Sequence, residues 1–335
     1  MMSSMRLLWQ RFWQRRTEQM YKIGDKVATR DAYGKALVEF AEQYDFVVLD
    51  ADLAEATKTV TFKKAYPDRF FDCGIAEGNM MCVAAGLAAA GKTAFASSFA
   101  MFAAGRAYEQ ARNAVGYPHL NVKIGATHAG LAVGEDGATH QCLEDLALMR
   151  TIPGMTVINP ADAVEARLAV KCAIETDGPF YIRFSRNPLP VVNDEETYTF
   201  ELGKGVTLRD GKDVTLVATG YMVSMALEAA EMLAGEGIDA RVINIHTLKP
   251  LDSELICKAA AETGAIVTAE EHNVIGGLGA AVAQAVCRGC PVPVLSVGTQ
   301  DVFGRSGKVP PLLEMYGLTP ANIAENAKKA IALKK

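Results

Sequence analysis

The feature that most constrains the fold is the alternation of short β-branched segments with helical patterns along the first half of the chain. The strand-like segments lie at 46–50, 93–97, 122–126, 155–159 and 180–184. Strands that are joined through helices pair in parallel. The helical segments space apolar residues three and four apart, as at Ala32, Leu37, Phe40 and Ala41, so each presents one stripe to a sheet. The pattern predicts a doubly wound α/β domain.

A polar, proline-bearing stretch, Asn187–Thr197, interrupts this pattern and offers few residues that could be buried, as is typical of a linker. A second series of strand segments follows at 214–218, 240–245, 265–269 and 292–297. At 335 residues, half of them apolar, the chain is long enough for two cores. We therefore predict two doubly wound α/β domains, at 25–188 and 205–335, with the linker at 189–204 and the second domain smaller.

The first 24 residues are basic and aromatic but lack the sustained apolar core and cleavage site of a signal peptide. We expect an extension that is disordered or follows a mis-assigned start codon, with an amphipathic surface helix as the alternative. The net charge of −5 argues against a broad nucleic-acid surface, and no stretch is long enough to span a membrane. Seven cysteines, mostly within apolar runs, indicate a reducing, cytoplasmic location.

Ligands of open α/β sheets bind at the carboxyl ends of strands, so the informative residues should follow strand ends. We expect a strand to end at Glu77 and an alanine-rich helix to follow it. A carboxylate there is ordinarily a favourable partner for the helix dipole. The alternative is a buried acid among Ile75, Met80 and Met81, whose pKa would rise so that it could share a proton with a ligand nitrogen.

Three further segments follow strand ends. Phe99 and Phe102 could stack on a flat ring, although phenylalanines more often belong to the core. The long glycine-rich segment from Gly125 to Gln141 carries His128 and His140, and two histidines in one such loop favour a functional role. Arg186 could bind a phosphate, although a surface salt bridge is the usual fate of an arginine.

In order and spacing, these segments resemble the pyrimidine-binding domain of transketolase, and the resemblance extends to the C-terminus. It covers nearly everything after residue 25. The most specific pieces are Gly74–Gly78, Gly134–Gln141 and Asn273–Gly279. The resemblance implies a thiamine diphosphate pyrimidine-binding domain followed by a transketolase C-terminal domain.

The resemblance also implies roles on the cofactor side. Glu77 would be the catalytic acid that hydrogen-bonds a ring nitrogen of the thiamine aminopyrimidine. Phe102, with Phe99 nearby, would stack on that ring, in a stretch that is longer here than in single-chain relatives. Ile75 and Asp52 would lie beside the cofactor.

Further roles fall on the substrate side. His140 would be catalytic and assist proton transfers at the substrate oxygens, and Asp136 would contact substrate hydroxyls. Arg30, His128 and Arg186 would hold the sugar phosphate. The reaction implied is transfer of a two-carbon ketol unit from a ketose phosphate to an aldose phosphate.

The family's diphosphate-binding domain, which holds magnesium, has no counterpart in this sequence. The resemblance therefore implies an N-terminal partner subunit that binds Mg²⁺ and the diphosphate, in an α2β2 assembly, with no metal ligands in this chain. Where the family commonly has a phosphate-contacting serine, this chain has Ala56. The alternatives are subunits resembling deoxyxylulose-phosphate synthase or the 2-oxo acid dehydrogenase β chain, or a non-catalytic subunit that keeps the fold.

Overall fold

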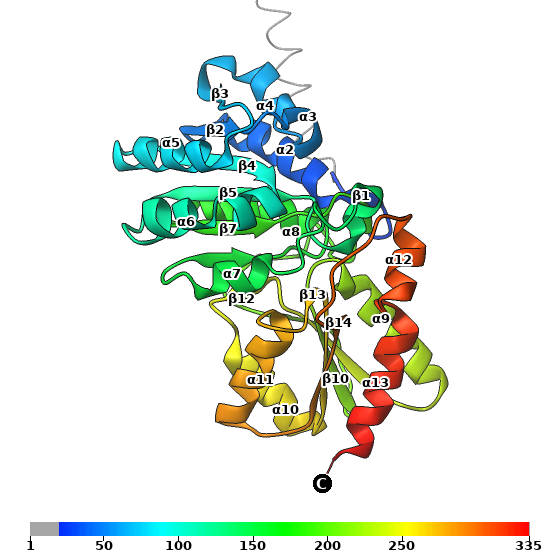
Figure 1. Ribbon diagram of the computed structural model, residues 1–335. Helices are drawn as coiled ribbons and strands as arrows, with labels where there is room; N and C mark the ends of the chain where they lie inside the picture. The colour runs from blue at the N-terminus through cyan, green and yellow to red at the C-terminus, as the bar shows by residue number, and fades with distance from the viewer. Residues whose placement is uncertain (1–19, 335) are drawn as a thin grey trace, which may run out of the picture.

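The first sheet is built from seven strands, in the order β12-β6-β7-β5-β4-β2-β3. The computed structural model describes residues 20–334, and the sheet forms the upper half of Figure 1. Its strands are β2 (Phe46–Asp50), β3 (Phe70–Asp72), β4 (Thr93–Phe99), β5 (Val122–Thr127), β6 (Thr156–Ile158), β7 (Phe180–Arg183) and β12 (Thr247–Lys249). All neighbours pair in parallel except β12, which runs antiparallel to β6.

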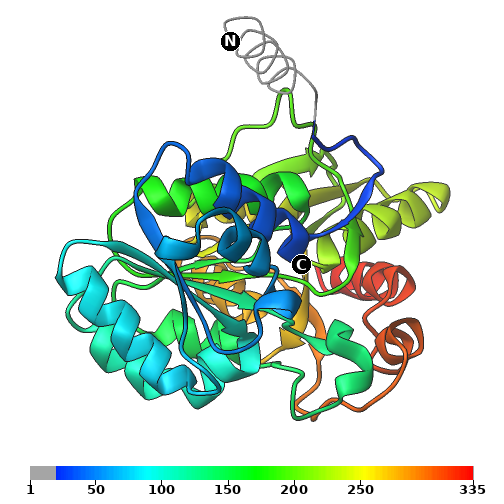
Figure 2. The same ribbon diagram turned by 90° about the horizontal axis from the view of Figure 1, so that it is seen from above.

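Helices cover both faces of this sheet. Helices α2 (Thr29–Phe40) and α8 (Ala163–Glu175) lie on one face, and α5 (Glu77–Ala89), α6 (Tyr108–Gln110) and α7 (Asp145–Thr151) lie on the other (Figure 2). Successive residues of a strand point to opposite faces. Within β2, Val48 accordingly packs in the core cluster of α2 and α8, whereas Val47 and Leu49 pack in the cluster of α5. The predicted doubly wound arrangement is confirmed.

The second sheet has five strands in the order β14-β13-β10-β11-β9 and lies below the first in Figure 1. Its strands are β9 (Val206–Arg209), β10 (Val214–Ala218), β11 (Ala240–Asn244), β13 (Ile266–Asn273) and β14 (Val294–Thr299). Helices α10 (Ser253–Thr263) and α11 (Leu278–Gly289) cover one face, and α9 (Met222–Gly235) and α13 (Pro320–Ala332) cover the other. Only the edge strand β9 pairs antiparallel.

Short strands and buried side chains lie at the predicted boundary between the domains. Three-residue strands β1 (Lys26–Ala28) and β8 (Pro188–Pro190) pair with each other, so the start of the predicted linker belongs to a strand. Within Asn187–Thr197, the buried residues are Leu189, Val191 and Asn193. Strand β12 also crosses the boundary, since it comes from the second half of the chain and joins the first sheet.

The predicted extension at 1–24 lies mostly outside the described residues. Its last residues pack against the linker region: Tyr21 is buried, its backbone N–H donates to Glu195, and the N–H of Gly24 donates to the carbonyl of Val191. These contacts tie Tyr21 and Gly24 to residues just beyond β8.

The order of strands locates a crevice. From β2 the chain moves to β3 on one side, and it then crosses to β4 on the other side of β2. The loops that follow β2 and β4 therefore run in opposite directions, and a crevice opens at the carboxyl ends of these two strands. The residues that follow β2 and β4 are thus placed at the natural ligand site of the sheet.

Candidate active site

The candidate site residues gather at the carboxyl edge of the first sheet. Asp52 follows β2, Phe99 ends β4, His128 follows β5 and Arg186 follows β7. Asp50 lies opposite Ser97 in the β2–β4 ladder, and Phe99 lies opposite Thr127 in the β4–β5 ladder. Because these strands run parallel and end nearly in register, the side chains just beyond them come together.

A cavity of about 390 Å³ occupies the crevice. Five of the ten candidate residues line it, together with four neighbours: Asp52, Ile75, Glu77, Phe102, His140, Ala51, Leu53, Arg106 and Thr139. All nine lining residues come from the first domain. The other candidates form a second cluster beside it, linked through the ring of Phe99.

Glu77 is a buried carboxylate at the start of α5. Its side chain is 2% exposed, and Nη1 of Arg106 donates to both of its oxygens at 3.0 Å. The apolar setting expected from Ile75, Met80 and Met81 is incomplete, because Arg106 bonds to the carboxylate and Ile75 is 77% exposed. Met80 and Met81 do lie buried behind it. The strand expected to end at Glu77 instead ends at Asp72, and Glu77 begins the helix.

Arg106 is a site residue that the sequence analysis did not identify. It ends the π-helical segment η2 (Met101–Arg106), and its guanidinium lies 4.6 Å from the ring centroid of Phe102. A π-helical turn accommodates an extra residue within a helix and often occurs at functional sites. The signal was present in the unusual length of the stretch around Gly105 and Tyr108.

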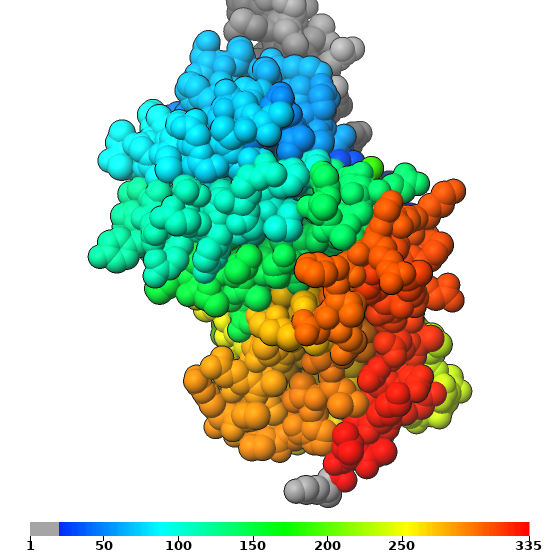
Figure 3. Space-filling model, viewed as in Figure 1, coloured from blue at the N-terminus to red at the C-terminus, as the bar shows by residue number. Residues whose placement is uncertain are grey.

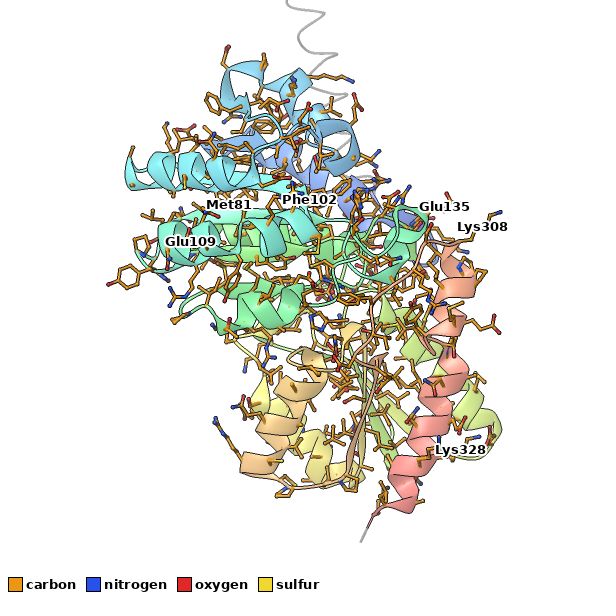
Figure 4. All side chains as sticks on the ribbon, in the orientation of Figure 1. Met81, Phe102, Glu109, Glu135, Lys308 and Lys328 are labelled. Carbon is orange, nitrogen blue, oxygen red and sulfur yellow. The ribbon has the colours of Figure 1, made fainter. Side chains whose placement is uncertain are left out.

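The two phenylalanines have different surroundings. Their rings stack with centroids 5.7 Å apart, but only Phe102 lines the cavity (labelled in Figure 4). His140 meets Phe102 edge-on, with centroids 5.3 Å apart. Phe99 is buried and stacks on the imidazole of His128 at 3.8 Å. Phe102 is therefore the ring available to a ligand in the cavity, and Phe99 supports His128.

His128 is held neutral in one tautomer. Its Nε2 lies 3.0 Å from Nη1 of Arg30, and because a guanidinium only donates, Nε2 accepts. The proton therefore lies on Nδ1, which donates to the hydroxyl of Thr127 at 2.9 Å. Burial, then the positive charges of Arg30, Arg186 and Lys58, lower the pKa of His128 to about 3.

Backbone strain accompanies this cluster. His128, Asp52 and Lys58 all have positive φ angles, at 56°, 61° and 71°, in a region that L-residues seldom adopt and that is enriched at functional sites. His128 lies just beyond β5 and Asp52 just beyond β2, whereas Lys58 ends the short helix α3 (Ala54–Thr57).

The cationic side chains are fixed by loop carbonyls and carboxylates. Arg30 donates to the carbonyl of Ala56 at 2.9 Å, so the position at which the family commonly has a serine contributes its backbone here. Arg186 donates to Asp136 at 3.3 Å and to the carbonyl of Val133. Lys58, which the sequence analysis also missed, pairs with Asp31 at 3.5 Å.

Asp50 organises the loop that carries Asp52. Its carboxylate accepts from the hydroxyls of Thr57 and Thr59 at 2.7 and 2.8 Å and from the N–H of Leu53 at 2.7 Å. Burial raises the pKa of Asp50 to about 6. Because Asp50 is fully buried, it shapes the cavity rim without lining the cavity.

Comparison with known proteins places the chain in a family. The model of the transketolase pyrimidine binding domain matches residues 25–191, and that of the transketolase C-terminal domain matches residues 203–323. The chain belongs to the transketolase family. The transketolase resemblance and the two-domain fold expected from the sequence are both confirmed.

Separately encoded transketolase subunits are among the relatives. A putative transketolase C-terminal section from Methanocaldococcus jannaschii is 50% identical over 299 residues, which cover 88% of this chain and 94% of that protein. A 6-deoxy-6-sulfo-D-fructose transketolase subunit from a Clostridium strain is 47% identical over 299 residues, which cover 89% of this chain and 92% of that subunit.

A solved structure described as a split gene transketolase, inactive β4 tetramer, is 54% identical and has a TM-score of 0.86, covering 93% of this chain and 100% of that chain. Human transketolase is 40% identical over 312 residues, which cover 91% of this chain but 49% of the human protein. This transketolase chain thus corresponds to the C-terminal section of the family, in split form.

Among residues 20–334, no group of three or more His, Cys, Asp or Glu side chains is arranged to hold a metal ion. In the same part of the chain, every helix is too short or too polar to cross a membrane.

Proposed function

We propose that this chain is the pyrimidine-side subunit of a split, cytoplasmic, thiamine diphosphate-dependent transketolase. It would transfer a two-carbon ketol unit from a ketose phosphate to an aldose phosphate. The observation that carries the proposal is the cavity in which a buried carboxylate, Glu77, lies beside the accessible ring of Phe102 and the imidazole of His140. A cluster of cations adjoins that cavity.

The cavity fits the aminopyrimidine of thiamine diphosphate. Phe102 offers an aromatic face, Glu77 offers an acid at a ring nitrogen, and Ile75 and Asp52 lie at the rim. When bound, thiamine diphosphate supplies the electron sink that accepts the charge released as the carbon–carbon bond breaks. Glu77 would hold the proton at N1′ of the pyrimidine. To do so it must share or exchange the hydrogen bonds that Arg106 now donates.

The adjoining residues suit a sugar phosphate. His140 would move protons at the substrate oxygens, and Asp136 would accept hydrogen bonds from hydroxyl groups. Arg30, His128 and Arg186 would bind the phosphate, for which guanidinium groups are well matched in geometry and charge. A phosphate among these groups would also favour a protonated His128, because a nearby anion stabilises the charged imidazole.

The second half of the active site would come from a partner. The chain aligns with about half of human transketolase, and its two matched domains are the pyrimidine-binding and C-terminal ones. We infer an N-terminal subunit that binds Mg²⁺ and the diphosphate, in an α2β2 assembly. Xylulose 5-phosphate and the pentose phosphate pathway are the starting hypothesis, although one relative is named for 6-deoxy-6-sulfo-D-fructose.

The test is reconstitution. The chain is co-expressed with a candidate diphosphate-domain subunit, and ketol transfer from xylulose 5-phosphate to ribose 5-phosphate is assayed with thiamine diphosphate and Mg²⁺. Glu77→Gln should lower kcat at least about 100-fold, the usual scale of general acid–base catalysis. Glu109→Gln is the matched control, because Glu109 lies on α6 outside the cavity and bonds to Asn113.

Three outcomes are informative. Activity that requires both subunits and is lost only in Glu77→Gln supports the proposal. Full thiamine-dependent activity of this polypeptide alone would exclude the obligate partner. Cofactor retention without transfer from xylulose 5-phosphate would redirect the search to other ketose donors, beginning with 6-deoxy-6-sulfo-D-fructose.

A further inference from the structure

The glycine-rich loop, Gly130–Gln141, carries Asp136 and His140, and its regular element is the short 3₁₀ segment η4 (Leu131–Asp136), which is kinked at Gly134. Gly130, Gly134 and Gly137 each have φ of 79°, which glycine adopts without strain. The base of the loop is closed by one backbone bond, from the N–H of Gly130 to the carbonyl of Cys142 at 3.0 Å. Because glycine is conformationally permissive, contacts from outside the loop help to select one conformation. Within the first domain, Arg186 and Asn187 donate to the carbonyls of Val133 and Ala132, and the C-terminal domain adds further contacts.

One such contact is Glu271, at the end of β13 in the C-terminal domain. The N–H of Ala132 donates to its carboxylate at 2.5 Å, and Nη2 of Arg183 donates to its backbone carbonyl at 2.9 Å. The approach is so close that a Cβ on Gly130 would lie 2.3 Å from the carboxyl carbon. Burial raises the pKa of Glu271 to about 7.

The second contact is the segment Gly304–Ser306, also in the C-terminal domain. The carbonyl of Arg305 accepts from the side-chain amide of Gln141 at 2.9 Å, and the hydroxyl of Ser306 donates to the carbonyl of Glu135 at 2.6 Å. Figure 3 shows the orange surface before α12 (Val309–Met315) against the green first domain. Glu135 and Lys308, labelled in Figure 4, mark this junction.

We propose that the C-terminal domain positions the glycine-rich loop for catalysis through Glu271 and Gly304–Ser306, and that Glu271 is a positioning residue. The inference rests on the proposed function, because it assigns the loop's Asp136 and His140 to substrate binding and proton transfer. No residue of the C-terminal domain lines the cavity. Its contribution to the reaction is therefore to hold Ala132, Glu135 and Gln141. Of these, Glu135 and Gln141 adjoin Asp136 and His140 in the sequence.

The contact itself is tested in the isolated full-length chain by hydrogen exchange. Glu271→Ala removes the acceptor of the Ala132 N–H, and amides at 131–138 should exchange at least about tenfold faster, as expected for a lost hydrogen bond to a charged group. Glu271→Gln keeps an acceptor oxygen and should restore most of the protection. Thr268→Val is the matched control, since Thr268 is buried on the same strand and bonds to Ser296 within the C-terminal domain.

The consequence is tested in the reconstituted pair. Glu271→Ala should raise the KM for the ketose phosphate and lower kcat/KM by about tenfold or more, because small misplacements of reacting groups have effects of this size. Thiamine diphosphate retention should be unchanged. Glu271→Gln should recover to within about threefold, and Thr268→Val should stay within about twofold of wild type.

The exchange and kinetic results together decide whether Glu271 positions the loop. Unchanged loop exchange in Glu271→Ala, or equal loss in Glu271→Ala and Thr268→Val, overturns the positioning role. If Glu271→Ala does not fold, Ser306→Ala replaces it, because Ser306 is exposed and its loss should loosen Glu135–Gly137 alone. If the wild-type pair transfers no ketol unit, the proposed function fails, while the exchange experiment still decides whether the C-terminal domain holds the loop.

Discussion

Lowering the pH from about 7.5 to about 5 is expected to destabilise the folded chain through one imidazole, that of His128. The side chain is 3% exposed, and burial, followed by Arg30, Arg186 and Lys58, lowers its pKa from 6.5 to about 3. In the unfolded chain the imidazole takes up its proton near the ordinary pKa. Between these two pKa values the unfolded state binds more protons than the folded state, so acid favours unfolding.

The magnitude follows from the two pKa values. A pH of about 5 lies about 1.5 units below the pKa of the imidazole in the unfolded chain. At 1.36 kcal/mol per unit, the loss of unfolding free energy is about 2 kcal/mol. Buried carboxyls contribute with the opposite sign, because burial raises the pKa values of Glu165 and Glu271 to about 7. The wild type must therefore be compared with His128→Asn, which removes the imidazole alone.

The assay is urea unfolding of the isolated chain at both pH values. The pH-dependent loss of unfolding free energy in wild type should exceed that in His128→Asn by about 2 kcal/mol. Arg30→Met should shrink the difference, because it removes one cation that lowers the imidazole pKa. Equal pH dependence in wild type and His128→Asn refutes the reasoning. A ¹⁵N–¹H spectrum near pH 7 should independently show His128 neutral, with its proton on Nδ1.

Three further predictions concern other buried groups. Arg106→Met removes the cation bonded to the Glu77 carboxylate and should lower the unfolding free energy by about 1 kcal/mol, a modest loss because the arginine side chain is 55% exposed; an unchanged urea midpoint argues against it. Arg183→Met leaves the fully buried Asp145, 2.8 Å away, without its cation. The unfolding free energy measured in urea should fall by about 3–5 kcal/mol, and a fall below about 1 kcal/mol contradicts this. Glu165 has a folded pKa of about 7, above its unfolded value, so stability should fall by about 2 kcal/mol as pH rises from about 5 to 7.5. Glu165→Gln should flatten that dependence in the same assay.

Much of the first domain could be predicted from the sequence because its strands are buried on both faces. Phe46–Asp50 and Val122–Thr127 are buried throughout and are bounded by helical patterns, and Phe46–Leu49 is a continuous apolar run of the kind that indicates a buried strand. Their carboxyl ends then placed Asp52 and His128 at one edge of the sheet. The family motif around Glu77 added its position at a helix start.

Short elements with distant partners could not be predicted. Strand β12 has three residues and pairs with β6, about 90 residues earlier in the chain, and β8 pairs with β1 across the whole first domain. Three residues carry too little periodicity to indicate a strand. Pairing over such separations depends on the fold as a whole, which is also why Leu189 and Val191 are buried in a stretch that resembles a linker.

The sequence by itself determined the two α/β domains, the strand ends that bear the site, and the residue types available for catalysis. Only the tertiary structure decided how these residues are charged and held. Arg106 meets Glu77 because a π-helical turn redirects the chain, and Glu271 reaches Ala132 because two domains pack together. Periodicity and strand propensity are local properties, whereas burial, ion pairing and protonation depend on neighbours that are distant in the chain.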